Sequence, residues 1–197
     1  GEEFRILSLT TNGSHEANHF NLTGSDRGGI AASASRVFYT GDRSTVRFKL
    51  DDLSEGAVLG QIFDAMVSDL KTAKVYSFAN GTNPLTAAGG TATALLEHDG
   101  DTGFLTGASV LLSAPISLPT STTVGFFAGY GRVVVHNGTR VYDILLPTGQ
   151  VTDLGFMPQP PHRSTPSWAL WGIAELFDGQ LYLSLVHAVS LAYMLLP

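Results

Sequence analysis

With 197 residues, 44% hydrophobic and only 14% charged, the chain is long enough for a full hydrophobic core and too apolar for intrinsic disorder. It contains no cysteine, which excludes a disulfide scaffold and a cysteine-ligated metal centre. The net charge of −6 argues against a phosphate-binding surface, so we expect no nucleic-acid partner. Secreted and cytoplasmic locations are both compatible with this composition.

The first third of the chain reads as short strands separated by turns. From Gly29, the sequence GIAASASRVFYTGD places a glycine at the start of one strand and Arg36 at the start of a second. Residues 45–50 (TVRFKL) alternate polar and apolar side chains, which is typical of a strand with one exposed face. Residues 59–70 suit a short helix or a strand, because their apolar positions fit both periods.

The middle of the chain continues with predicted strands. KVYSFANG begins at Lys74 and ends in an Asn-Gly dipeptide, which hairpin turns favour. Residues 91–97 (TATALLE) and 110–118 (VLLSAPISL) are rich in apolar residues and lie between turn residues. We interpret these two stretches as most of an additional, degenerate strand unit.

The last third repeats the first pattern. From Gly125, GFFAGYGRVVVHNG again has a glycine before one strand and a basic residue, Arg132, before the next, and residues 140–146 (RVYDILL) follow as a further strand. A third copy, GIAELFDGQLYLSLV, begins at Gly172. The apolar residues 181–197 contain a histidine and have no flanking basic residue, so we expect a pair of strands rather than a membrane span.

The second-strand positions Arg36, Lys74, Arg132 and Gln180 are 38, 58 and 48 residues apart. Four-stranded blades of β-propellers recur at about 40–50 residues. Through GGIAASASRVFYTGD, VGFFAGYGRVVVHNG and WGIAELFDGQLYL, the sequence resembles the β-propeller superfamily, without the dipeptide signatures of WD40 repeats or the double glycine of kelch repeats. The resemblance implies an all-β array of four to five antiparallel blades; a β-sandwich or another β-barrel is the alternative.

Two short patterns bear on metal binding. The segment EHDGD at 97–101 carries alternating carboxylates that suit calcium, but Asp99-Gly100 also suits a tight hairpin turn, which is the interpretation we favour. HEANH at 15–19 matches the zinc-protease pattern, which requires a helix. Its asparagine-rich surroundings favour a loop instead. We therefore expect no metal and no cofactor.

The longest stretch without strand character is 156–170 (FMPQPPHRSTPSWAL), whose prolines exclude it from a sheet interior. Long loops in compact domains are often functional. Aromatic side chains beside a cationic donor are common in ligand pockets, and a linker whose tryptophans cover the core is the structural alternative. The candidate ligand-binding residues are His162, Arg163, Trp168 and Trp171, together with the acids Asp64 and Glu97.

We expect residues 1–197 to form a single all-β domain, or a fragment of a larger propeller, that recognises a small polar ligand, a glycan or a protein and does not span a membrane. One alternative is a propeller-type hydrolase or lyase using inner-strand carboxylates such as Asp64, Glu97 and Glu175; no catalytic residue is identified. Another is a structural fragment completed by a second chain. Residues 5–9 (RILSL) are expected to pair with the apolar C-terminal strands, with self-association through these terminal strands as the alternative.

Overall fold

The structure is a computed structural model and describes residues 3–10, 13–21, 29–40, 45–51, 56–59, 66–69, 71–85, 89–118, 125–128, 131–137, 139–156, 168–175, 181–187 and 190–195. Among these residues every regular element is a β-strand and every strand pairing is antiparallel, so the all-β prediction is confirmed. No helix with the length and apolar character needed to cross a membrane occurs in this part of the chain.

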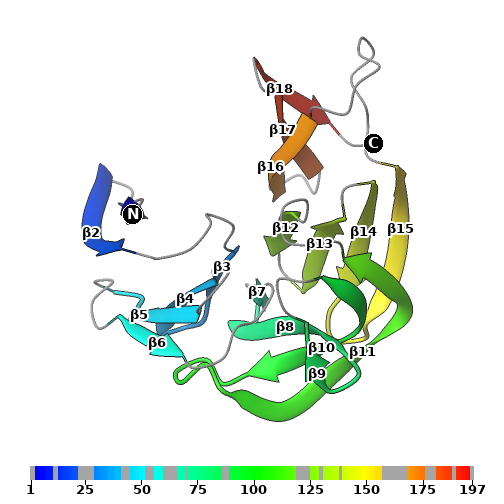
Figure 1. Ribbon diagram of the computed structural model, residues 1–197, viewed down its shortest axis with the longest axis horizontal. Coiled ribbons are helices and arrows are strands. Elements are labelled where there is room, and N and C mark those ends of the chain that lie inside the picture. Colours follow the sequence, from blue (N-terminus) through cyan, green and yellow to red (C-terminus); the bar gives the residue numbers. More distant parts are fainter. Residues whose placement is uncertain are drawn as a thin grey trace.

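The described strands form five sheets, shown in Figure 1 as successive groups along an arc. The first is the hairpin of β1 (Glu3–Thr10) and β2 (Gly13–Asn21), and the second contains β3 (Gly29–Ala32), β4 (Arg36–Thr40), β5 (Thr45–Lys49) and β6 (Ala57–Leu59). The third contains β7 (Met66–Asp69), β8 (Lys74–Asn80), β9 (Asn83–Pro84), β10 (Gly90–His98) and β11 (Leu105–Leu118). The fourth contains β12 (Gly125–Ala128), β13 (Arg132–His136), β14 (Arg140–Leu145) and β15 (Gln150–Phe156), and the fifth β16 (Trp168–Glu175), β17 (Leu181–His187) and β18 (Ser190–Leu195).

The units identified from their glycines coincide with strand pairs. Gly29 opens β3 and Gly125 opens β12, whereas Gly172 lies inside β16. Arg36, Lys74 and Arg132 each begin the second strand of a sheet, as the spacing predicts. Gln180 lies outside the described residues.

Two uncertain regions of the sequence are strands where the structure describes them. The end of the 59–70 segment is β7, which supports the strand interpretation over the helix there. HEANH at 15–19 lies in β2, so the expected loop is wrong, and the extended backbone also removes the helix that the zinc-protease pattern requires.

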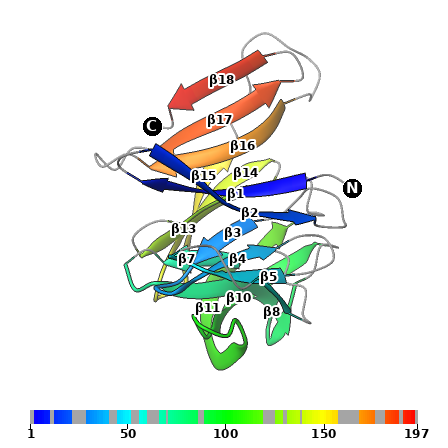
Figure 2. The same ribbon diagram turned by 90° about the vertical axis from the view of Figure 1, so that its left-hand side faces the viewer.

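The two ends of the chain pair locally. β1 pairs with β2, and β18 pairs with β17, which separates it from β16 (Figure 2). No hydrogen-bonded ladder among the described strands joins these two terminal sheets. The expected pairing of residues 5–9 with the C-terminal strands is therefore not present, because each apolar terminal strand finds its partner in the neighbouring segment.

The first strands of the sheets, β3, β7, β12 and β16, contact one another in chain order. β7 stands between two of these neighbours and its side chains serve both. Met66 belongs to a buried apolar cluster with Phe38 of β4, whereas Val67 belongs to the larger cluster that includes Val133 of β13. Because successive side chains of a strand point to opposite faces, β7 contributes one apolar residue to each sheet interface.

The next two residues of β7 repeat this division with polar groups. The hydroxyl oxygen of Ser68 accepts a hydrogen bond of 2.7 Å from the backbone N–H of Ala32 in β3. The carboxylate of Asp69 accepts one of 2.7 Å from the backbone N–H of Gly131, just before β13. Ser68 and Asp69 are both buried, so each bond joins β7 to a neighbouring sheet where water has little access.

The carboxylate of Asp69 also accepts hydrogen bonds from the Lys71 N–H (2.9 Å) and the Thr72 hydroxyl (2.7 Å). Burial alone raises the pKa of Asp69, but the bonds from Thr72, Lys71 and Gly131 outweigh it and hold that pKa below its usual value. Asp69 is therefore a buried, ionised acceptor on which two sheets depend.

We predict that Asp69→Ala lowers the free energy of unfolding by about 2–3 kcal/mol, because three donors, one of them the Gly131 N–H, lose a charged acceptor. Asp69→Asn keeps one acceptor oxygen and should cost less. Urea denaturation monitored by fluorescence measures both, with Thr152→Ala at an exposed position of β15 as the control. Equal stability of Asp69→Ala and the control would contradict the role of Asp69.

Candidate functional site

The sequence-predicted ligand residues that the structure describes lie on strands of two different sheets. Glu97 is on β10, the third strand from the inner side of its sheet, whereas Trp168 and Trp171 are on β16 of another sheet. His162, Arg163 and Asp64 lie outside the described residues, so their predicted role remains a prediction. Of the acids named for the hydrolase alternative, Glu97 is not on the first strand of its sheet, whereas Glu175 ends β16, which is the first strand of its sheet.

The recurring basic residues at second-strand starts are held by carboxylates. The ion pairs, measured from side-chain nitrogen to oxygen, are Arg36 with Asp101 (2.8 Å), Lys74 with Glu97 (2.7 Å) and Arg132 with Asp143 (2.6 Å). The Glu97 interaction raises the pKa of Lys74. A nearby carboxylate offsets the positive charge at each of these three positions.

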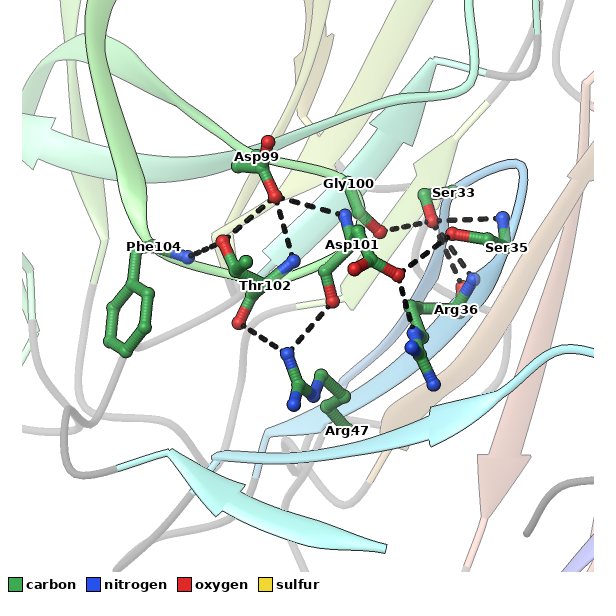
Figure 3. A network of polar contacts seen from close by, with 9 residues as sticks. All are labelled: Ser33, Ser35, Arg36, Arg47, Asp99, Gly100, Asp101, Thr102 and Phe104. Atoms are coloured by element: carbon green, nitrogen blue, oxygen red, sulfur yellow. Dashed lines mark hydrogen bonds and ion pairs between the residues drawn. The ribbon is translucent and has the colours of Figure 1, made fainter. Parts of the chain in front are cut away.

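The acidic segment at 97–101 lies in a turn, but the tight hairpin turn expected at Asp99-Gly100 is wrong, because β10 ends at His98, β11 begins only at Leu105, and neither Asp99 nor Gly100 has the positive φ that such a turn requires. Asp99 Oδ1 accepts hydrogen bonds from the Thr102 N–H (2.7 Å), the Thr102 hydroxyl (2.8 Å) and the Asp101 N–H (3.1 Å) (Figure 3). The bonds from the Thr102 N–H and hydroxyl lower the pKa of Asp99. Its carboxylate is committed to the local backbone, which is the usual function of aspartate in such turns.

This turn also docks on the β3–β6 sheet. Arg47 Nη1 donates to the carbonyl oxygens of Asp101 (2.9 Å) and Thr102 (3.2 Å), and the Ser33 hydroxyl donates to the carbonyl of Gly100. Figure 3 shows Ser33, Arg36 and Arg47 converging on the turn from that sheet. In the described part of the chain no three His, Asp or Glu side chains come together as a metal site would require. The turn that follows β10 therefore holds its own sheet against the β3–β6 sheet.

His98, next to this turn, is 2% exposed and has a partner on each ring nitrogen. Nδ1 lies 2.7 Å from the carbonyl oxygen of Gly103 and Nε2 lies 2.8 Å from the Ser77 hydroxyl. A carbonyl only accepts, so Nδ1 carries the proton and Nε2 accepts from Ser77. Burial lowers the pKa of His98, although the Gly103 bond partly opposes this.

The surface with the clearest binding character is the outer edge of β11. This strand is last in the order of its sheet and pairs only with β10. No Asp, Glu, Lys or Arg occurs between Asp101 and Arg132, so β11 carries no charge that would protect an exposed edge. Leu111, on this strand, is 71% exposed.

Two irregularities limit the usable part of this edge. Towards the start of the strand, Gly107 has a positive φ of 88° beside a register shift relative to β10. Towards the end, the Ser113 N–H donates to the carbonyl of Gly149 (2.9 Å) and the Ser113 hydroxyl oxygen accepts from the Val151 N–H (2.8 Å). We call residues 108–112, between these points, the β11 edge.

Gly149 makes that second contact possible. It lies in the turn between β14 and β15 with a φ of +71°, and a Cβ built on it would collide with the carbonyl oxygen of Leu111. Only glycine lets the turn approach β11 this closely, and the turn therefore lies against the Leu111 carbonyl within the β11 edge. Sequence analysis recognised residues 110–118 as a strand but missed its free edge; the uncharged stretch from 102 to 131 was the available signal.

No protein-family model matches the chain, and no curated protein matches it in sequence. Among solved structures it is similar to the extracellular domain of a putative hybrid two-component system from B. thetaiotaomicron (TM-score 0.51, 10% identity, covering 97% of this chain and 26% of that one). It is also similar to Myxococcus xanthus glutaminyl cyclase (0.50, 14%, 86% and 73%) and to a protein of unknown function from Bacteroides caccae (0.50, 11%, 96% and 67%).

At these low sequence identities, the similarity to the three structures concerns the fold alone. The neighbours include propeller-like folds, which agrees with the resemblance of the sequence to a divergent propeller. The chain spans about a quarter of the length of the two-component-system domain that it matches.

We predict that His98 titrates below pH 6.5, because folding buries its ring in the neutral form. As the pH falls through 6.5, His98 gains a proton in the unfolded chain but not in the folded chain. The free energy of unfolding therefore decreases as the pH falls. NMR titration of the His98 ring measures the pKa directly. Urea midpoints at pH 7.5 and 5.5 should differ less in His98→Gln than in the native chain, and a His98 pKa at or above 6.5 would contradict the assignment.

Proposed function

We propose that this chain is a recognition module built as an open array of propeller blades, and that it binds an extended segment of a partner protein along the β11 edge. The observation that carries the proposal is an uncharged strand whose outer edge has no neighbouring strand among the described residues.

The blade interpretation is supported by the arrangement of the sheets. Their first strands contact one another in chain order, and three sheets begin their second strand with a basic residue. Five successive antiparallel sheets correspond to the four to five blades expected from the sequence. The described strands of the two terminal sheets share neither a ladder nor an extensive contact, which supports an open array to which a second chain could contribute.

The β11 edge fits strand addition by a partner. An edge strand presents unpaired backbone N–H and C=O groups, and an added strand satisfies them while side-chain contacts provide selectivity. The irregularity at Gly107, the Gly149 turn against the Leu111 carbonyl and the bonded Ser113 leave only a short free edge, so the partner segment is short. Because the edge lacks charge and exposes Leu111, the best partner segment is uncharged and carries an apolar side chain opposite that leucine.

Three of the carboxylates whose side chains the structure describes have structural partners. Glu97 is paired with Lys74, Asp99 is bound by its own turn, and Asp69 joins two sheets. A hydrolase requires at least two acids directed at one pocket. These three acids have structural partners in three different places.

We predict that peptides selected against the immobilised chain from a display library of short random sequences are extended, uncharged and apolar at alternate positions. Leu111→Lys should weaken their binding about tenfold or more in calorimetry, because a charge on the edge opposes strand addition. Leu50→Lys, at another exposed leucine in the turn after β5, is the matched control and should bind normally.

Hydrogen exchange locates the bound peptide. We expect added protection at residues 108–112 and little change elsewhere. Equal loss of affinity in Leu111→Lys and Leu50→Lys, or protection confined to other strands, would show that the β11 edge is not the binding site.

A further inference from the structure

A second exposed cluster lies at the far end of the β14–β15 pair, where Arg140 and Phe156 are opposite each other in register. The Arg140 guanidinium carbon lies 4.5 Å from the centroid of the Phe156 ring, which is a cation–π contact. Arg140 Nε also donates to Asp153 Oδ2 at 2.7 Å. One guanidinium thus contacts an aromatic face and a carboxylate together.

The backbone fixes this arrangement. Asp153 Oδ1 accepts a 2.8 Å hydrogen bond from the N–H of Gly155, which has a φ of +103° close to a register shift between β14 and β15. The Gly155 N–H, together with Arg140, holds the pKa of Asp153 below its usual range. Both carboxylate oxygens therefore have a defined direction, and Arg140 is oriented before any ligand arrives.

Phe156 remains 75% exposed although Arg140 covers one of its faces. Its opposite face and much of its edge are consequently open to solvent. The Nη groups of Arg140 have no hydrogen-bond partner among the described residues, and Asp153 is partly exposed with acceptor capacity remaining.

The groups available to a ligand are an aromatic face, N–H donors and carboxylate acceptors within one short stretch of two strands. The charges of Arg140 and Asp153 cancel, which favours neither an anion nor a cation. A ligand that fits has C–H groups on one face, to lie on the electron-rich ring, and hydroxyl groups at its rim, to exchange hydrogen bonds with both charged groups. A pyranose ring combines these properties.

We propose that Arg140, Asp153 and Phe156 form a binding site for a neutral saccharide, separate from the β11 edge. The sugar lies on the free face of Phe156, the Arg140 Nη groups donate to its hydroxyl oxygens, and the Asp153 carboxylate accepts from its hydroxyl groups. Phe156 is also the first residue of the 156–170 segment in which the sequence predicted ligand binding, and the residues directly after it lie outside the described part of the chain.

Affinity electrophoresis of the native chain in gels containing dextran, xyloglucan or galactomannan tests this site, with polygalacturonate as an anionic comparison. We expect at least one neutral polymer to retard the chain. Phe156→Ala should reduce that retardation at least fivefold, and Phe156→Trp should preserve it, because an aromatic face remains. Phe104→Ala removes another exposed phenylalanine, 58% exposed on a different turn, and should have no effect.

The variants distinguish the outcomes. Circular dichroism verifies that each variant is folded. Because the Phe156 side chain is mostly exposed, we expect its replacement to leave the fold intact. Asp153→Asn and Arg140→Gln should each weaken retardation by a neutral polymer, since each removes one set of hydrogen bonds to hydroxyl groups. The proposal is overturned if no neutral polymer retards the native chain, if only polygalacturonate does, or if Phe104→Ala loses as much as Phe156→Ala. The proposal of peptide binding at the β11 edge does not depend on the outcome of these experiments.

Discussion

The alternation of side chains along β7 is the constraint on which the centre of this molecule depends. Four consecutive residues supply an apolar and a polar contact to the preceding sheet, through Met66 and Ser68, and the same two kinds of contact to the following sheet, through Val67 and Asp69. A shift of one residue would exchange the two sets, placing each polar group against the wrong neighbour. The strand therefore determines how its sheet meets the sheets on both sides.

Charged residues are scarce in this chain, and several of them hold a turn or join two sheets. Arg36 and Arg47 hold the turn at 99–102 against the β3–β6 sheet, and Asp99 holds the turn itself. Contacts between sheets in this fold are made by a few directed bonds around the apolar clusters. The β11 edge and the free face of Phe156 lack such bonds and are the surfaces that we propose for partners.

The local pattern in the sequence was sufficient for most strands and for the presence of a turn at Asp99, but not for the type of that turn. Gly29 and Gly125 mark strand starts because their effect on the backbone is local. The role of Asp69 could not be predicted, since its partner Gly131 is 62 residues away and only the folded chain brings them together. Phe156 was assigned to a loop because prolines follow it, yet it ends β15 and pairs with Arg140. Long-range register decided both cases.

The lack of a ladder between the described terminal sheets has a consequence for cooperativity. In a closed ring every sheet has two neighbours, and losing one exposes surface on both sides. In an open array each contact is between nearest neighbours, so stability approaches a sum over adjacent pairs, as in repeat proteins. The sheet containing β16 contacts its neighbour through β12 and is then released with the loss of that one interface, whereas the sheet containing β7 opens only when two are lost.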